Sequence, residues 1–176
     1  GWSRQALQTY LKETGQYPLR HYIQPPGKTA LSLIGEHGQG SFPGYGSGMP
    51  EDDDLNYTVI ALAVYEDKGP RFTPEDIAEA WLFRLPLLKT FTAERVAYRN
   101  LSLGILPPRS ASFRNPYREW IGARIRADFW GYVSPCSPRR AARFALRDAC
   151  VSHVKNGIYG AMATSAMVAS AFETRD

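Results

Sequence analysis

Three consecutive aspartates, Asp52, Asp53 and Asp54, stand where a long loop gives way to an apolar segment. The loop, residues 25–50, is rich in glycine and proline, whereas residues 55–65 are almost entirely apolar and predict a buried helix. Three adjacent carboxylates repel one another, and a hard divalent ion such as Mg²⁺, which prefers oxygen ligands, would relieve the repulsion. The alternative is a solvated acidic cap, because Asp is a good N-cap and acids favour the N-terminal end of a helix. One aspartate suffices for a cap, so the sequence leaves both interpretations open.

Size and composition predict one globular domain over residues 1–176. The chain is 44% hydrophobic and 22% charged, which is ordinary for a protein with a packed core. Its net charge of +4 is dispersed, with only short clusters such as Arg139-Arg140, and this disfavours a nucleic-acid partner. The chain has no apolar run of the ~18 residues that a membrane span needs, and its first residues do not resemble a signal peptide. The spacing of Cys136 and Cys150 suits neither a redox pair nor a zinc cluster, which favours ordinary thiols in the cytoplasm.

The hydrophobic periodicity predicts an all-α fold with long loops, because apolar residues recur at helical spacing and no segment alternates at period two. Capping residues, glycines and prolines place the helix ends. Small residues between 141 and 171 predict that the last two helices pack closely and lie centrally. The aromatic side chains expected in the core are those of Trp81, Trp120, Phe129 and Trp130. The predicted helices cover residues 3–15, 53–67, 73–85, 92–104, 115–129, 137–153 and 158–172.

Two further groups are candidates for chemistry. Arg124 and Arg126 lie two positions apart on a predicted helix, so their side chains should point apart, with one facing a phosphate-binding pocket or each making a surface ion pair. His153 lies near the end of a predicted helix, where a histidine usually interacts with the helix dipole or acts as a cap. The functional alternative is that His153 contacts a ligand in a central groove. The glycine-rich segment 38–48 lacks the GxxxxGK[ST] pattern of a phosphate loop and is interpreted as a surface loop.

Three segments together resemble the ADP-ribosylglycohydrolase family, which includes the dinitrogenase-reductase-activating glycohydrolase. Residues 49–58, Met-Pro-Glu-Asp-Asp-Asp-Leu-Asn-Tyr-Thr, are similar to the bacterial branch that carries EDDDLNYT. Residues 121–131, Ile-Gly-Ala-Arg-Ile-Arg-Ala-Asp-Phe-Trp-Gly, are similar to a glycine-containing ligand segment of the family. Residues 147–160 contain Ser152-His153 and resemble the segment whose Ser/Thr-His motif lies near the bound ADP-ribose. The resemblance covers nearly the whole chain.

The resemblance implies an all-α orthogonal bundle with long loops over a central cleft and two Mg²⁺ ions. It implies a magnesium-dependent hydrolase that cleaves an ADP-ribosyl or related ribosyl glycosidic bond. The ions would orient a water and lower its pKa. The implied substrate is an ADP-ribosylated protein or a small ADP-ribosyl compound, with no nucleic-acid or membrane partner and a cytoplasmic location. The implied metal ligands are Asp52, Asp53 and Asp54, of which Asp53 and Asp54 are also catalytic, and the implied substrate-binding residues are Gly122, Arg126 and His153.

The sequence departs from the family pattern in two places. It lacks an earlier helix that carries glycines and an acidic residue, and it lacks the later Asp-x-Asp segment that supplies the other half of the metal site. Residues 52–54 alone cannot hold two ions, so we expect the chain to be the N-terminal and central portion of a larger ADP-ribosylglycohydrolase domain. The alternative is a catalytically inactive relative that binds ADP-ribose or a nucleotide.

Overall fold

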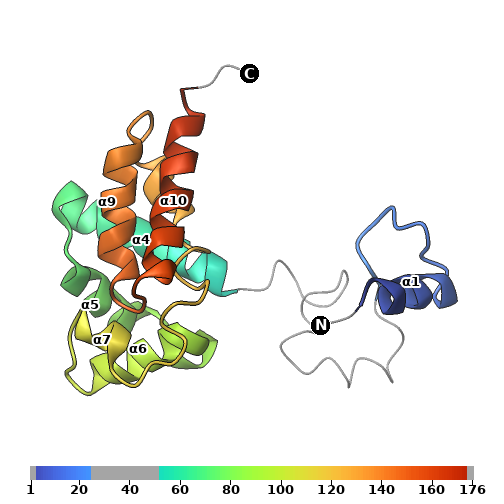
Figure 1. Ribbon diagram of the computed structural model, residues 1–176, viewed down its shortest axis with the longest axis horizontal. Helices are drawn as coiled ribbons and strands as arrows, with labels where there is room; N and C mark the ends of the chain where they lie inside the picture. The colour runs from blue at the N-terminus through green and yellow to red at the C-terminus, as the bar shows by residue number, and fades with distance from the viewer. Residues whose placement is uncertain (1–2, 25–51, 174–176) are drawn as a thin grey trace. The chain divides into compact units, whose positions relative to one another are not determined.

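The computed structural model describes residues 3–24 and 52–173 (Figure 1). Its contacts divide the chain into two compact units, residues 1–51 and 52–176, and each is described by itself. The expectation of one incomplete domain stays a prediction. In the first unit, helix α1 covers Arg4–Glu13. As predicted, it is capped by Ser3, whose side-chain oxygen accepts a hydrogen bond from the amide of Ala6 at 3.1 Å.

The second unit is helical in the part that the structure describes, and residues 52–173 contain no strand, which confirms the all-α prediction (Figure 1). Its helices are connected by turns and by two short 3₁₀ segments, Gly69–Arg71 and Leu87–Lys89. Helices α9 and α10 pack along one another, as the small residues between 141 and 171 predict. The α-helices are α4 Asp53–Lys68, α5 Pro74–Arg84, α6 Thr92–Ser102, α7 Arg109–Ser112, α8 Asp128–Tyr132, α9 Pro138–Ala149 and α10 Asn156–Ala171.

Local capping explains where helix α5 begins. The hydroxyl of Thr73 accepts a hydrogen bond from the amide of Asp76 at 3.2 Å, and the Asp76 carboxylate accepts one from the amide of Thr73 at 2.7 Å. This reciprocal pair satisfies two amides that a helix start would otherwise leave open. Pro74 at the first helical position adds a preset backbone angle. The predicted start of this helix is confirmed.

The helix predicted over residues 115–129 is wrong, because successive turns occupy residues 115–127 and only α8 follows. The side chain of Asn115 accepts a hydrogen bond from the amide of Tyr117 at 3.2 Å, and such local bonds compete with helix formation. A turn carbonyl, that of Arg118, accepts a hydrogen bond from the amide of Val154 at 2.8 Å. The turns therefore tie this segment to the chain that follows α9.

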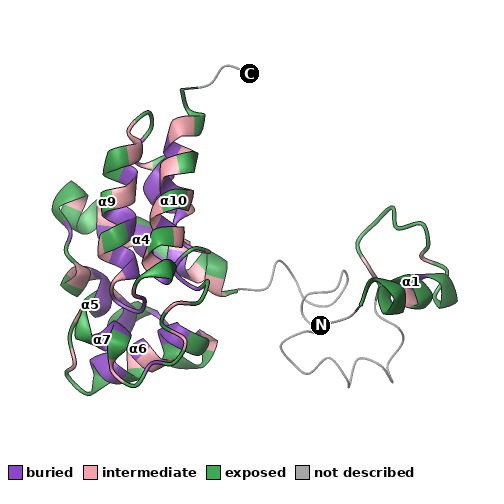
Figure 2. Ribbon diagram, in the orientation of Figure 1, coloured by how far each residue is buried: buried purple, intermediate pink, exposed green. Residues whose placement is uncertain are grey.

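The core of the second unit is built around aromatic rings from several helices, and Figure 2 shows the buried residues along the facing sides of these helices. Phe72 stacks on Trp130 with ring centroids 4.5 Å apart, and Phe144 packs against both rings. Trp81, Phe129 and Trp130 are buried as predicted. Trp120 is 55% exposed, so its assignment to the core is wrong.

Candidate functional site

The three aspartates lie at the start of helix α4, as the sequence predicts. Asp52 is the N-cap, and its carboxylate accepts a hydrogen bond from the amide of Leu55 at 2.9 Å. Asp53 and Asp54 occupy the first turn, where Asp53 is half-buried and Asp54 is exposed. Within the described residues, neither of these two carboxylates is paired with a Lys, Arg or His side chain. Asp52 is therefore confirmed as a helix cap. Asp53 and Asp54 do not cap the helix.

Negative charge is crowded around Asp54. Partial burial raises the pKa of the Asp54 carboxyl, and Asp53, Asp52 and Asp128 raise it further, although a backbone hydrogen bond opposes them. Asp128 is the first residue of α8, and α8 contacts α4. The starts of two helices thus bring a fourth carboxylate towards the three that are adjacent in sequence.

These residues supply the oxygen donors that a hard cation prefers. Residues 3–24 and 52–173 contain no group of three or more His, Cys, Asp or Glu side chains arranged to hold a metal ion. Magnesium commonly binds through one or two carboxylates and retains several waters. The start of α4 therefore fits one side of a magnesium site, with Asp53 and Asp54 as the available carboxylates.

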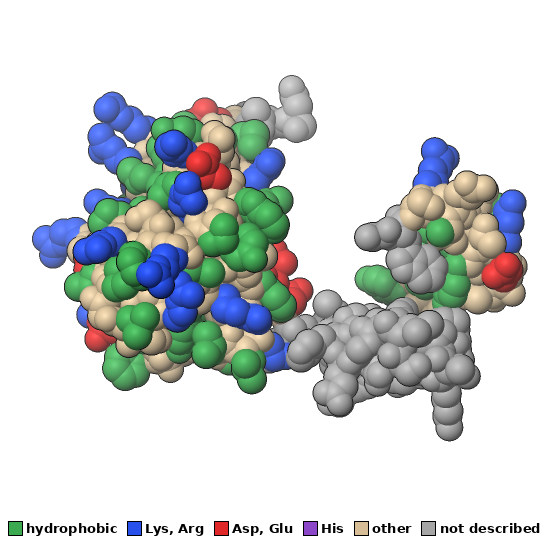
Figure 3. Space-filling model, turned by 60° about the horizontal axis from the view of Figure 1, so that its bottom comes forward, with side chains coloured by type: hydrophobic (Ala, Val, Ile, Leu, Met, Phe, Trp, Pro, Cys, Tyr) green, Lys and Arg blue, Asp and Glu red, His purple; other side chains and the backbone are tan. Residues whose placement is uncertain are grey.

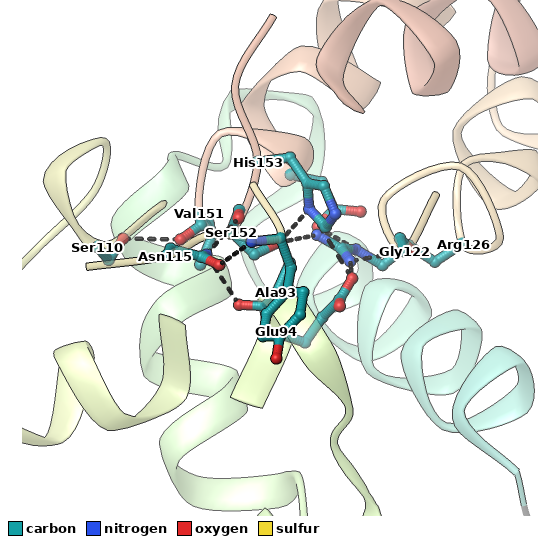
Figure 4. Close-up of polar contacts among 11 residues, drawn as sticks. Ala93, Glu94, Ser110, Asn115, Gly122, Arg126, Val151, Ser152 and His153 are labelled. Carbon is teal, nitrogen blue, oxygen red and sulfur yellow. Dashed lines mark hydrogen bonds and ion pairs between the residues drawn. The ribbon is translucent and has the colours of Figure 1, made fainter. Parts of the chain in front are cut away.

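Arg126 lies at the centre of a buried polar cluster and is 1% exposed (Figure 4). Its guanidinium donates to the carboxylates of Glu94 at 2.7 Å and Asp148 at 3.0 Å. It also donates to the hydroxyl of Ser152 at 2.9 Å and to the carbonyl of Gly122 at 3.3 Å. The cluster joins α6, α9, the turns before α8 and the turn after α9. Arg126 therefore connects its own turn segment to α6 and to the end of α9 with the turn that follows it, which lie far away in the sequence.

Aromatic rings enclose the guanidinium of Arg126. Its central carbon lies 5.0 Å from the ring centroid of Tyr57 and 4.9 Å from that of Trp81. Such cation–π contacts strengthen when the cation is removed from water. Tyr57 lies one helical turn after Asp53. Burial is the main cause that raises the pKa of Tyr57 and of Glu94, and the charge of Asp53 adds a smaller contribution to both. Tyr57 therefore connects the aspartate end of α4 to the cluster.

One guanidinium in this cluster faces two carboxylates. Burial by itself lowers the pKa of Arg126, but Asp148 and Glu94 raise it above its ordinary value, so the guanidinium stays charged. Burial raises the pKa of Glu94, and Arg126 acts against that shift. Asp148 gains a second donor, because the indole of Trp130 hydrogen-bonds its other oxygen at 2.9 Å. The negative charge of Glu94 is thus stabilised by fewer side-chain donors than that of Asp148.

The hydroxyl of Ser152 links Arg126 to His153. Because Arg126 has only donors, the Ser152 hydroxyl accepts from it and is free to donate to Nδ1 of His153, which lies 2.8 Å away. In the tautomer that accepts this bond, the proton of the neutral imidazole lies on Nε2. Burial, followed by the charge of Arg126, lowers the pKa of His153 to about 3, so the ring is neutral at physiological pH. Nε2 of His153 is buried without a hydrogen-bond partner among the described residues, as is the hydroxyl of Tyr57.

Two glycines make room for this cluster. A Cβ atom on Gly122 would overlap the carboxylate of Glu94, so only glycine lets the turn approach the ion pair. A Cβ atom on Gly157 would lie 2.7 Å from Cδ2 of His153. Gly122 and Gly157 therefore set how closely their segments approach the cluster.

Buried hydrogen bonds extend outward from the cluster and hold its frame (Figure 4). The side-chain amide of Asn115 donates to the carbonyls of Ala93 at 3.1 Å and Ser152 at 3.2 Å. The hydroxyl of Ser110 donates to the carbonyl of Val151 at 2.7 Å. These bonds fix the turn after α9 against α6 and α7.

The structure brings Gly122, Arg126 and His153 together, but in a buried cluster. Arg126 and His153 are 1% and 0% exposed, so neither side chain reaches solvent in the described structure. Their assignment to substrate binding stays a prediction. Sequence reasoning missed Glu94 and Asp148 as members of the cluster. A signal was present, since each acid lies beside small core residues of its helix, Ala93 and Ala97 or Ala145 and Ala149.

Each helix in the described residues is too short or too polar to cross a membrane. Searches among curated proteins and among solved structures gave no match. A family model, described as ADP-ribosylglycohydrolase, matches residues 2–176. The match covers the aspartates at the start of α4 and all members of the buried cluster. The chain therefore belongs to the ADP-ribosylglycohydrolase family.

Proposed function

We propose that this chain supplies the aspartate side of a magnesium site that hydrolyses an ADP-ribosyl glycosidic bond. Membership of the ADP-ribosylglycohydrolase family supports a glycosyl hydrolase activity, and the magnesium and the specific substrate are the proposed part. The observation that carries the proposal is the crowding of negative charge at Asp54, where three other carboxylates add to the effect of partial burial in raising the pKa of the carboxyl. A divalent cation would relieve that repulsion. The position is accessible, because Asp54 is exposed at the start of α4.

In this proposal Asp53 and Asp54 bind the metal and are the catalytic carboxylates. Asp52 contributes as a ligand through the carboxylate oxygen that does not cap the helix. The complete site would hold two ions, and the remaining ligands would come from outside residues 52–54. When bound, magnesium supplies charge stabilisation and lowers the pKa of a coordinated water. The chain's own part is to fix two carboxylates on the rigid first turn of a helix.

We assign Gly122, Arg126 and His153 a role in shaping the substrate site. The cluster around Arg126 holds the turns at residues 115–127 and 150–155 against α6 and α9. Because His153 is neutral, it is suited to position a turn and not to act as an acid at physiological pH. The substrate we propose is an ADP-ribosylated protein or a small ADP-ribosyl compound.

The proposal also places the protein in the cytoplasm. Its two cysteines are free thiols, with Cys136 exposed and Cys150 partly buried. Burial raises the pKa of Cys150 to about 11, which makes it a poor nucleophile. Both fit ordinary thiols in a reducing compartment.

Calorimetric titration with magnesium tests the proposal. We expect the double substitution Asp53→Asn with Asp54→Asn to weaken binding at least about tenfold, because it removes two of the three proposed carboxylate ligands. Asp67→Asn is the matched control, since Asp67 is an exposed aspartate at the other end of α4. Equal affinity in the double variant and the wild type would refute the metal site.

An inactive relative that binds ADP-ribose is the second candidate. It is favoured by the lack of a group of three metal-binding side chains in the described residues. Incubating the protein with ADP-ribosylated arginine and serine peptides, with magnesium present, separates the two candidates. Release of free ADP-ribose, followed by chromatography, supports the hydrolase. Binding of ADP-ribose without release supports the inactive relative.

A further inference from the structure

We infer that α6, α7 and the chain around them form a docking surface for an acidic protein that carries apolar side chains among its carboxylates. This surface, which we name the α6–α7 face, lies on the second unit and does not depend on the proposed hydrolase. Its basic residues are Arg95, Arg99, Arg109 and Arg114, and its exposed apolar residues are Leu88, Phe91, Leu103 and Leu106.

The net positive charge of the chain comes from this region. Residues 84–118 contain seven Lys and Arg and a single acid, Glu94. The whole chain has 21 Lys and Arg and 17 Asp and Glu, so the remainder holds 14 basic and 16 acidic residues. Glu94 is buried and paired with Arg126, so it does not offset the basic side chains at the surface. The positive charge is therefore concentrated in this stretch of the chain, which corrects the interpretation of the charge as dispersed.

Helix α6 presents Arg95 and Arg99 on one side, and its C-cap residue Leu103 follows at the same interval of four residues. The side chain of Arg95 lies over the ring of Phe91, 5.6 Å from its centroid, and reaches the carbonyl of Leu88 at 3.5 Å. The arginine therefore lies directly beside exposed apolar side chains.

Helix α7 packs against α6, which holds it in place. The side-chain amide of Asn100 donates to the carbonyls of Ser110 and Phe113, both at 2.8 Å. Two arginines lie near the ring of Phe113, with Arg109 5.8 Å and Arg114 5.5 Å from its centroid. The result is a second pairing of arginine with an aromatic ring.

The four arginines of the α6–α7 face have no carboxylate partner among the described residues. Figure 3 turns this end of the second unit forward, and Lys and Arg side chains gather there among hydrophobic ones, with few Asp or Glu. An acidic partner would supply the missing charge and would be guided to the face during encounter. The charge of the partner thus follows from the face itself.

The apolar residues favour a protein over a nucleic acid. Leu88 is 79% exposed and Leu103 is 67% exposed. Aliphatic side chains gain nothing from a phosphate backbone, which is recognised through charge. Arginine together with aromatic and aliphatic side chains is the composition of a protein interface, where arginine often contributes strongly to binding.

Binding of three probes to the whole chain tests the inference. The first is a glutamate-rich peptide with leucine at every fourth position, the second replaces leucine by serine, and the third is a single-stranded DNA of equal charge. We expect the leucine peptide to bind most tightly, and Leu88→Ser with Leu103→Ser to remove its advantage over the serine peptide. DNA binding more tightly than either peptide would overturn the inference.

A matched pair of variants separates the face from net charge. Arg95→Gln with Arg99→Gln should weaken binding of the leucine peptide about tenfold, since in this inference both arginines contact the peptide directly. Arg139→Gln with Arg140→Gln removes the same charge from exposed residues of α9 and should change affinity less than about twofold, the effect of distant screened charges. Equal losses in the two variants, or binding of no probe by the wild type, would show that the face is not a docking surface.

Discussion

The carboxylate of Glu94 lies 2.7 Å from the guanidinium of Arg126, and both side chains are withdrawn from solvent. The pair joins the first turn of α6 to the turns that precede α8. A buried ion pair is weak evidence of net stabilisation, since removing both charges from water is costly. Breaking such a pair is nevertheless expensive, because the remaining charge stays buried without compensation. The pair therefore makes the arrangement of the turns depend on one arginine.

Replacing Arg126 by methionine should destabilise the protein by about 3–5 kcal/mol, the usual cost of leaving buried charge unpaired. Two carboxylates, those of Glu94 and Asp148, would lose their shared partner. Urea unfolding followed by circular dichroism measures the change. Arg124→Met is the control, because Arg124 is exposed and its side chain bonds Thr164. A loss for Arg126→Met no larger than that for Arg124→Met would contradict the central role of Arg126.

The sequence predicted that Arg124 and Arg126 point apart, and the structure confirms it, with Arg126 buried and Arg124 exposed. It did not predict the partners of Arg126. Glu94 is 32 residues away and Asp148 is 22 residues away. Periodicity identifies the buried side of each helix but not which sides meet, and Glu94 looked like an ordinary acid in a first helical turn. Long-range pairing is therefore the part of the cluster that the sequence leaves undetermined.

Gly122→Ala should destabilise the protein by about 1–3 kcal/mol, the typical cost of overpacking a filled interior. The new Cβ would overlap the carboxylate of Glu94, which Arg126 prevents from moving away. Gly160→Ala is the control, because its Cβ would meet only Cδ of Arg124, at 3.8 Å. Since Gly160 lies within α10, alanine there should stabilise by about 0.5–1 kcal/mol. Thermal unfolding of both variants shows whether the opposite signs occur.

In the variant His153→Asn, the free energy of unfolding should fall less steeply as the pH is lowered below about 6.5. The pKa of His153 falls from 6.5 to about 3 on folding, so below about pH 6.5 the unfolded chain binds a proton that the folded protein does not. The stability from the neutral ring is complete above pH 6.5 and is lost towards pH 3, at up to ~1.4 kcal/mol per pH unit.

Measuring the free energy of unfolding of both proteins between pH 4.5 and 7.5, and subtracting, isolates this effect. The subtraction is needed because Glu94 acts in the opposite direction. Burial raises the pKa of Glu94, so folding takes up a proton there and stability rises on acidification. Two parallel curves for the wild type and His153→Asn would mean that His153 is protonated equally in the folded and unfolded states.

The start of α4 was predictable, whereas the segment before α8 was not. Capping by Asp52 depends only on residues within one helical turn, which the sequence displays directly. At residues 115–127 the apolar spacing suggested a helix. The Asn115 side chain bonds backbone groups of Ala93, Ser152 and Tyr117 instead, and two of these are distant in the sequence. Tertiary bonds to backbone groups therefore overrode the local pattern.

Two substitutions at Asp52 can separate its cap from its proposed contact with a metal. Asp52→Ala should cost about 1 kcal/mol of stability without metal, because the Leu55 amide loses its acceptor. Asp52→Asn should keep that stability, because asparagine caps a helix as well as aspartate does. An asparagine side chain is neutral, so if Asp52 also binds magnesium, Asp52→Asn should weaken magnesium binding while the helix remains capped. Unfolding without metal and calorimetric titration with magnesium, performed on both variants, measure the two roles independently. Loss of stability together with unchanged magnesium affinity in Asp52→Ala would leave Asp52 as a cap alone and restrict the metal site to Asp53 and Asp54.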